Sequence, residues 1–275
     1  MITSAILATR MVGALPASSG ESGFEPPSID DFFPAPFALQ GTPFELNRVM
    51  MVRLIMACAL VLVFVIGAAR ARVVPGRFQN ALEMILGFVR KNVAEEILGP
   101  DVGRRYAPVL TTIFLGVLFL NISGVIPGLQ IASTGVVGMP LVFAIVSYIV
   151  FFYAGVRTNG VGRYIKGSLA PTGVPGFLYP LIIPIEFLSN LIMRPVTLTI
   201  RLLANMVSGH FLLALCYAAT SALFLHAAGV LKGLGAVTFG VALAFVLFEV
   251  FVAALQAYIF ALLTAVYIES SINTH

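Results

Sequence analysis

The stretch that decides the fold is residues 233–268, GLGAVTFGVALAFVLFEVFVAALQAYIFALLTAVYI, in which Glu249 is the single charged residue. A helix of this length measures about 54 Å at 1.5 Å per residue, whereas about 20 residues are enough to cross the hydrocarbon layer of a membrane. The stretch therefore predicts a membrane helix that is steeply tilted, with a kinked or partly re-entrant segment as the alternative.

A second long apolar region, residues 177–231, precedes this stretch and also exceeds one perpendicular span. We expect two long tilted helices, over about 177–228 and about 233–269, which meet near the turn HAAGVLKGLG. The charged residues of the second region are Glu186, Arg194 and Arg201.

The composition of the whole chain indicates an integral membrane protein. Only 10% of its 275 residues are charged and 59% are hydrophobic, and the mean hydropathy is +1.01. Ordinary soluble domains are about 25% charged. The formal net charge of +4 does not indicate nucleic-acid binding, because the basic residues stand beside apolar segments and form no single stripe. Cys58 and Cys216 lie in apolar runs without CxxC spacing, so we expect buried thiols.

Three shorter spans are predicted before the long helices. The first is 49–69, and two more lie within 106–156, which has no charged residue and is broken near Pro127 and Pro140. Between the first of these spans and the other two, apolar residues at helical spacing predict an amphipathic surface helix over about 76–98. The predicted fold class is therefore all-α, with five membrane-crossing helices.

The arginine-rich segment 70–105 sets the predicted orientation. The positive-inside rule assigns this segment to the cytoplasmic side. The acidic segment before the first span then lies outside, and five crossings leave the C-terminus in the cytoplasm. We divide the chain into an external N-terminal arm, 1–47, and a single membrane domain, 48–275.

Arg201 is the least expected residue of the second apolar region. A guanidinium stays protonated at physiological pH, and placing it at the centre of a bilayer costs at least about 2.5 kcal/mol. Either Arg201 is a structural charge paired with Glu186 or Glu249, or another subunit supplies its carboxylate. On a helix, Asn205 lies on the same side as Arg201, and His210 lies on the opposite side.

Glu249 and Gln256 are seven residues apart and therefore lie nearly on one face of the last helix, about 10 Å apart along its axis. Neighbouring alanines permit the close approach of a facing helix. Glu249 is either protonated or meets a partner such as His210, and an imidazole beside a carboxyl group can relay protons near neutral pH. A lone histidine is more often a hydrogen-bonded core residue.

Motifs of several other function classes are missing from the sequence. There is no GxSxG, HExxH or GxxxxGK[ST], so neither hydrolase nor nucleotide-binding chemistry is indicated, and no cofactor or metal is expected. No internal repeat indicates a self-contained transporter. Besides a subunit that works within a larger complex, the sequence leaves open a stand-alone ion channel or secondary transporter first, and a structural membrane scaffold second.

Two segments together carry a family resemblance. RPVTLTIRLLANMVSGH, residues 194–210, and FEVFVAALQAYIFALLTAVYI, residues 248–268, closely resemble subunit a of the F-type ATP synthases. FLGVLFLNISGVIPG, residues 114–128, resembles an earlier membrane helix of that family. In the family, subunit a is the membrane stator beside a rotating ring of c subunits. Two offset half-channels carry ions to and from a carboxylate on each ring subunit.

The resemblance implies a role in proton translocation for four residues near the ring. Arg201 corresponds to the stator arginine, with Asn205 and Gln256 as its polar neighbours. Glu186 corresponds to an acid near the cytoplasmic half-channel.

Three further residues correspond to the outer half-channel of the family. His210 and Glu249 match its pair of titratable positions, which occur in either order, and Asn121 matches a polar channel position. This chain departs from the pattern at Gly124, where many relatives have an acid three residues after the asparagine.

The resemblance also implies partners and a location. The partners are the c-subunit ring with its ion-binding carboxylate, b-type peripheral stalk subunits and the lipid bilayer, and no nucleic acid is expected. Protons are the expected ion, and ATP is made by distant soluble subunits, so this chain is not catalytic alone. The location is the bacterial inner membrane, with the N-terminus outside and the C-terminus cytoplasmic.

Overall fold

The computed structural model describes residues 47–126, 134–164, 179–226 and 230–273, and the regular elements within these ranges are all helices. Five of the described helices are long and apolar enough to cross a membrane, which confirms the predicted all-α membrane fold. The predicted N-terminal arm lies outside the described residues, apart from its last residue, Asn47. The five helices are α2 (Arg48–Ala69), α5 (Pro100–Ile122), α6 (Gly138–Asn159), α9 (Arg194–His226) and α10 (Val230–Ile272).

Helix α2 begins at Asn47, whose Oδ1 accepts a hydrogen bond from the backbone N of Met50 at 2.8 Å. Asparagine is a favoured N-cap because its side chain satisfies a backbone donor that the first turn leaves unpaired. Most of the helix is exposed, including the free thiol of Cys58. The expectation that both cysteines are buried was wrong for Cys58, because only one face of α2 packs against the rest of the chain, and Cys216 is half-buried.

The predicted surface helix over 76–98 is not a single regular helix. It consists of α3 (Arg77–Val89), a π-helical turn η2 (Arg90–Glu95) and a short helix α4 (Glu96–Leu98). Val93 and Ala94 in the π turn are fully buried, and this turn packs against α5. The segment ends at Gly99, where φ is +78°, a conformation that favours glycine.

Helix α5 lies at the centre of the packed core, against the C-terminal half of α10 and the segment η2. Small side chains at intervals of about four residues let α10 approach its neighbours closely. The fully or nearly fully buried residues of this half of α10 are Ala257, Phe260, Ala261, Thr264, Ala265 and Ile268.

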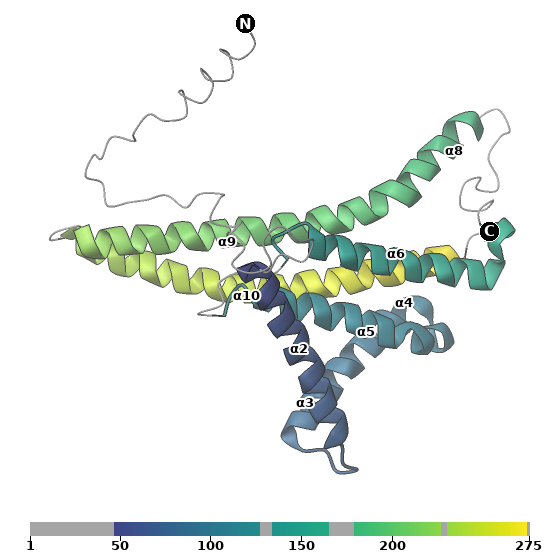
Figure 1. Ribbon diagram of the computed structural model, residues 1–275, viewed down its shortest axis with the longest axis horizontal. Helices are drawn as coiled ribbons and strands as arrows, with labels where there is room; N and C mark the ends of the chain where they lie inside the picture. Colours follow the sequence, from purple (N-terminus) through teal and green to yellow (C-terminus); the bar gives the residue numbers. More distant parts are fainter. Residues whose placement is uncertain (1–46, 127–133, 165–178, 227–229, 274–275) are drawn as a thin grey trace, which may run out of the picture.

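The second apolar region forms one helical rod, made of α8 (Tyr179–Phe187), the π-helical turn η4 (Leu188–Met193) and α9. The π-helical turn ends just before Pro195, which has no backbone N–H to donate a helical hydrogen bond. Helices α9 and α10 lie side by side and antiparallel along the long axis of the molecule, and α8 bends away at one end (Figure 1).

Arg194 joins this rod to the last helix. Its guanidinium carbon lies 4.8 Å from the centre of the Tyr267 ring and 5.9 Å from that of Phe151. Both distances are within the range of a cation–π contact. Arg194 therefore holds the beginning of α9 against α6 and the C-terminal end of α10.

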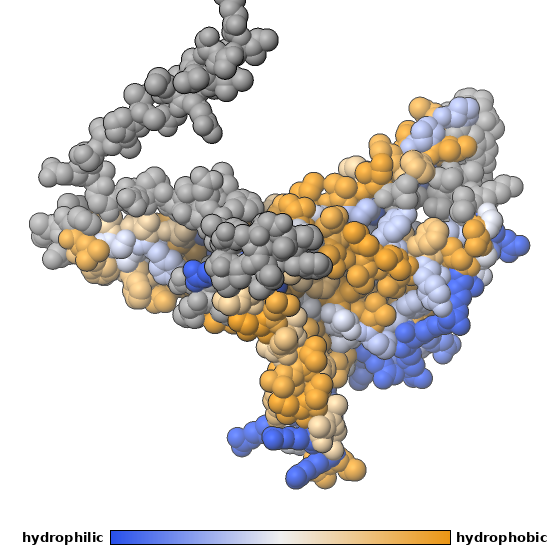
Figure 2. Space-filling model, in the orientation of Figure 1, coloured by the Kyte–Doolittle hydropathy of each residue, from blue (hydrophilic) through white to orange (hydrophobic). Residues whose placement is uncertain are grey.

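The surface has the distribution of hydropathy that a multi-pass membrane protein requires. Figure 2 shows apolar residues covering α2 along most of its length and a broad area near the centre of the same face. Hydrophilic residues gather at the turn between α2 and α3 and around α4 (Figure 2). An apolar band with polar ends is what a bilayer stabilises, because its interior offers no partners to charged groups.

Candidate functional site

The candidate site lies where α9 crosses α10, and it begins with a polar line on one side of α9. Arg201 is half-buried, and Asn205 and Ser208, one and two turns further on, are exposed. Ser208 was missed at the sequence level, although its position seven residues after Arg201 puts it on the same face. The exposed residues around this line are apolar, namely Ile200, Ala204, Val207, Phe211 and Leu215.

Arg201 makes no ion pair or hydrogen bond with another described residue. The alternative that it is a structural charge paired with Glu186 or Glu249 therefore finds no support. Its guanidinium lies on a membrane helix beside an apolar surface, where an unpaired charge is costly.

Asn205 and Gln256 connect the two long helices directly. The Nδ2 of Asn205 donates a hydrogen bond to the Oε1 of Gln256 at 2.9 Å. Gln256 is only 3% exposed, and its Nε2 has no hydrogen-bond partner among the described residues. The structure thus brings together two of the predicted polar neighbours of Arg201, one helical turn away from it.

Glu249 lies against α9 at a glycine. A Cβ atom built on Gly209 would lie 3.1 Å from the Oε1 of Glu249, so the absence of a side chain there makes room for the carboxyl group. Glu249 is 6% exposed, and neither of its carboxyl oxygens has a hydrogen-bond partner within the described part of the chain. A direct hydrogen bond to His210 is therefore not formed.

His210, the next residue along α9, points toward the end of α5. A Cβ atom on Gly124 would overlap the Nε2 of His210 and would lie 2.9 Å from the methyl carbon of Met206. The imidazole therefore occupies the space that a side chain at position 124 would need. The glycine at position 124, where many relatives have an acid, has a spatial reason. The imidazole of His210 and a side chain at position 124 would occupy the same space, so the chain has room for only one of them without a rearrangement.

Asn121 lies in the last turn of α5, three residues before Gly124, and is fully buried. Its Oδ1 accepts a hydrogen bond from the Oγ1 of Thr134 at 2.7 Å, across 13 residues of chain. Thr134 was missed at the sequence level, because it follows a Gly- and Pro-containing break without any periodic pattern. Asn121 thus contributes a hydrogen-bonded amide to the side of the site that holds His210.

Glu186 is not part of this group. It is half-buried on α8, 15 residues before Arg201, which corresponds to about 22 Å along a helical rod. His210 is nine residues beyond Arg201, or about 14 Å in the other direction. Along the rod of α8 and α9, Arg201 therefore lies between Glu186 on one side and His210 on the other.

The arrangement suits the transfer of protons better than it suits chemistry on a bound substrate. It combines a buried carboxyl group and a buried imidazole, which can take up and release protons, with buried amides that can form hydrogen bonds, inside an apolar surface. Water can bridge polar groups that are close but not in direct contact.

Comparisons with known proteins agree over most of the chain. The family model for the ATP synthase A chain matches residues 49–269. ATP synthase subunit a of Rhodococcus erythropolis is 47% identical over 250 residues, which cover 91% of this chain and 91% of that protein. The protein of the same name from Pseudarthrobacter chlorophenolicus is 36% identical over 261 residues, covering 94% and 97%. That from Streptomyces lividans is 31% identical over 254 residues, covering 92% and 89%.

Proposed function

Because the chain belongs to the ATP synthase A chain family, we propose that it is the proton-translocating stator in the membrane sector of an F-type ATP synthase. Membership of this family makes it a non-catalytic membrane subunit of the complex, with a part in ATP synthesis and proton transport. The proposal concerns how it does so, through two half-channels and the charge of Arg201.

The observation that carries the proposal is that Arg201 has no anionic partner in the described part of the chain. An ion pair in a low-dielectric layer offsets part of the cost of both charges, so the missing carboxylate belongs on another subunit. The c-subunit ring supplies it. Apolar exposed residues surround Arg201 on α9, as a sliding contact with a ring of membrane helices requires.

The same charge prevents a direct leak between the half-channels. A ring carboxylate that approaches Arg201 has its pKa lowered by the guanidinium and releases its proton before it passes. Each charge that crosses 100 mV releases about 2.3 kcal/mol, and this free energy drives rotation only when protons cannot bypass the ring.

The separation of the titratable residues supports two offset half-channels. His210 and Glu249 line the outer one, together with Asn121, and Glu186 belongs to the cytoplasmic one. Arg201 lies between them along the rod of α8 and α9. Because Glu249 makes no direct hydrogen bond to His210, water connects the two groups.

An ATP-driven pumping assay tests the proposal. We expect Arg201→Ala in the assembled complex to abolish ATP-driven proton pumping and ATP synthesis without loss of assembly, and Arg201→Lys to restore little. Lysine lacks the planar fork and loses its proton more readily in an apolar site. The matched control is Arg77→Ala on the exposed surface helix. Pumping at the parental rate in Arg201→Ala would exclude the stator role, and proton flux through the purified chain alone would favour a stand-alone channel.

The proposed orientation puts the N-terminal arm outside and the C-terminus in the cytoplasm, and the proposed partners include b-type peripheral stalk subunits. We expect single cysteines at Asp30 and Arg163 to react with an impermeant thiol reagent from opposite sides of the membrane. The parent for this experiment has Cys58 and Cys216 replaced by serine, because both are free thiols. Reaction of both positions from one side would contradict five crossings.

A further inference from the structure

A groove separate from the α9–α10 site lies between α2, the surface segment and α5. It has a volume of about 730 Å³, within the range of roughly 300–1,000 Å³ that is usual for ligand pockets. Its walls are mostly apolar, and the four from α2 are Leu60, Val61, Phe64 and Val65. Two arginines, Arg90 of η2 and Arg104 of α5, complete the lining.

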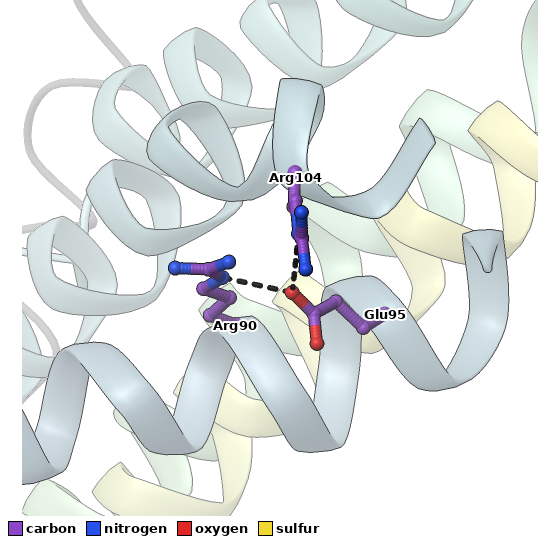
Figure 3. A network of polar contacts seen from close by, with 3 residues as sticks. All are labelled: Arg90, Glu95 and Arg104. Atoms are coloured by element: carbon purple, nitrogen blue, oxygen red, sulfur yellow. Dashed lines mark hydrogen bonds and ion pairs between the residues drawn. The ribbon is translucent and has the colours of Figure 1, made fainter. Parts of the chain in front are cut away.

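The two arginines meet at a single carboxylate. The Nε of Arg90 lies 2.8 Å from the Oε1 of Glu95, and the Nε of Arg104 lies 3.6 Å from the same oxygen (Figure 3). The Arg90 hydrogen bond, with the Arg104 charge, holds the pKa of Glu95 below its ordinary value, so Glu95 stays ionised. Two positive charges and one negative charge leave the cluster with a net charge of +1.

Most donors of these two arginines are still available. Both contacts with Glu95 use Nε, and the terminal Nη groups make no hydrogen bond or ion pair with a described residue. The side chains of Arg90 and Arg104 are 49% and 65% exposed. Guanidinium groups with free terminal N–H donors bind phosphate oxygens, often through two parallel hydrogen bonds.

The shape of the groove matches one leaflet of a membrane. Along α5 it extends from Arg104 to Leu115, eleven residues or about 16 Å. One half of a hydrocarbon layer about 30 Å thick measures about 15 Å. The arginines are at the end of the groove nearest the basic surface segment, so the charged end and the apolar length have the order of a lipid headgroup and its acyl chain.

We propose that this groove binds one anionic phospholipid, with its phosphate at Arg90 and Arg104 and an acyl chain along α2 and α5. Basic pockets between membrane helices are suited to anionic headgroups, because the net positive charge adds to the hydrophobic contacts. The lipid fills the space between α2, α3 and α5 and so stabilises the position of the surface helix. This inference does not rest on the proton-channel proposal, because none of its residues belongs to the α9–α10 site.

Lipid binding to the assembled ATP synthase tests the inference. The complex is placed in nanodiscs of palmitoyl-oleoyl phosphatidylcholine that contain a small, varied fraction of palmitoyl-oleoyl phosphatidylglycerol, and the phospholipid retained after extraction is measured by native mass spectrometry. We expect the double variant Arg90→Gln with Arg104→Gln to weaken retention of phosphatidylglycerol on the order of tenfold, as for the loss of a charge-assisted hydrogen bond. The double variant Arg72→Gln with Arg77→Gln, an equal change of charge outside the groove, leaves retention unchanged.

A second pair of variants tests the apolar part of the groove without changing charge. Val61→Trp fills the groove and lowers retention, whereas Leu62→Trp, on the next exposed position of α2 outside this groove, does not. Unchanged retention in the double arginine variant, or equal retention of phosphatidylcholine, overturns the inference. So does displacement of the lipid by inorganic phosphate, or capture of another subunit instead of lipid by a photo-crosslinker at position 61.

Discussion

The two halves of α10 bury polar side chains in opposite ways. In the C-terminal half, Thr264 donates to the carbonyl oxygen of Phe260 at 2.9 Å, and its Oγ1 lies 3.1 Å from the Oγ of Ser147 on α6. In the N-terminal half, neither carboxyl oxygen of Glu249 has a hydrogen-bond partner among the described residues. The same helix therefore has a buried threonine whose hydroxyl group is hydrogen-bonded and a buried glutamate whose carboxyl group is not.

We interpret this difference as a structural role for the C-terminal half of α10 and a functional role for the N-terminal half. A buried polar group without a partner costs about 1–3 kcal/mol, and more when it is charged, so folding alone does not favour it. The C-terminal half packs on α5 and α6 as a structural seam. In the function we propose, the carboxyl group of Glu249 in the N-terminal half takes its partners from outside the chain, as water or protons.

The largest effect is expected from variants of Glu249, in the N-terminal half of α10, and of His210 on α9. We expect Glu249→Gln and His210→Leu each to reduce proton flux by roughly tenfold or more, about 1.4 kcal/mol of barrier, because each removes one proton-carrying group. The variant with Glu249→His and His210→Glu should recover part of the rate, since a relay needs both groups. Flux is measured in vesicles that contain the assembled membrane sector. Parental flux in both single variants would make the pair structural.

Gly124 tests whether the position of His210 is as constrained as the close contact indicates. Gly124→Ala should slow proton flux by roughly tenfold, or about 1.4 kcal/mol, because its Cβ atom would displace the imidazole. Gly124→Asp combined with His210→Ala should be faster than Gly124→Asp alone, because the smaller residue at position 210 makes room for the acid. The control is Gly138→Ala, where a Cβ atom meets nothing within 4 Å. Parental flux in Gly124→Ala would show that the imidazole moves freely.

The structural seam predicts a smaller effect, and one on stability. Ala265 is 0% exposed, so Ala265→Leu should lower the free energy of unfolding by about 1–3 kcal/mol through overpacking. The matched control, Ala236→Leu, makes the same change at an exposed position of α10 and should have little effect. Thermal unfolding of the detergent-solubilised chain is the measurement. Equal destabilisation by both variants would remove the distinction between the two halves.

The same contrast appears between whole helices. In the most apolar 18-residue window of α5, the mean hydropathy is 1.5 and 61% of the residues are buried within the chain. In that of α10, the mean hydropathy is 2.4 and only 17% of the residues are buried. In a bilayer, high hydropathy marks contact with lipid or with another membrane subunit, and it does not predict burial within the chain.

Much of the fold could be predicted because the bilayer imposes it. Every membrane-crossing segment satisfies its backbone groups as a helix, so the lengths of the apolar runs 49–69, 177–231 and 233–268 were enough to predict spans there. The π-helical turns η2 and η4 could not be predicted, because they depend on how a helix packs or accommodates a proline and not on hydropathy. The exposure of Cys58 was missed for a related reason, since hydropathy cannot tell a lipid-facing side from a packed one.

By itself, the sequence determined the class of the protein, its family resemblance and the unusual charge of Arg201, because composition, motif and helical periodicity are local properties of the chain. Only the tertiary structure decided that Glu249 lies on Gly209, that His210 occupies the space beside Gly124, and that Arg90 and Arg104 meet at Glu95. Each of these arrangements brings together residues from different segments of the chain. Whether two side chains touch depends on the rotation and separation of the helices that carry them, and packing alone sets both.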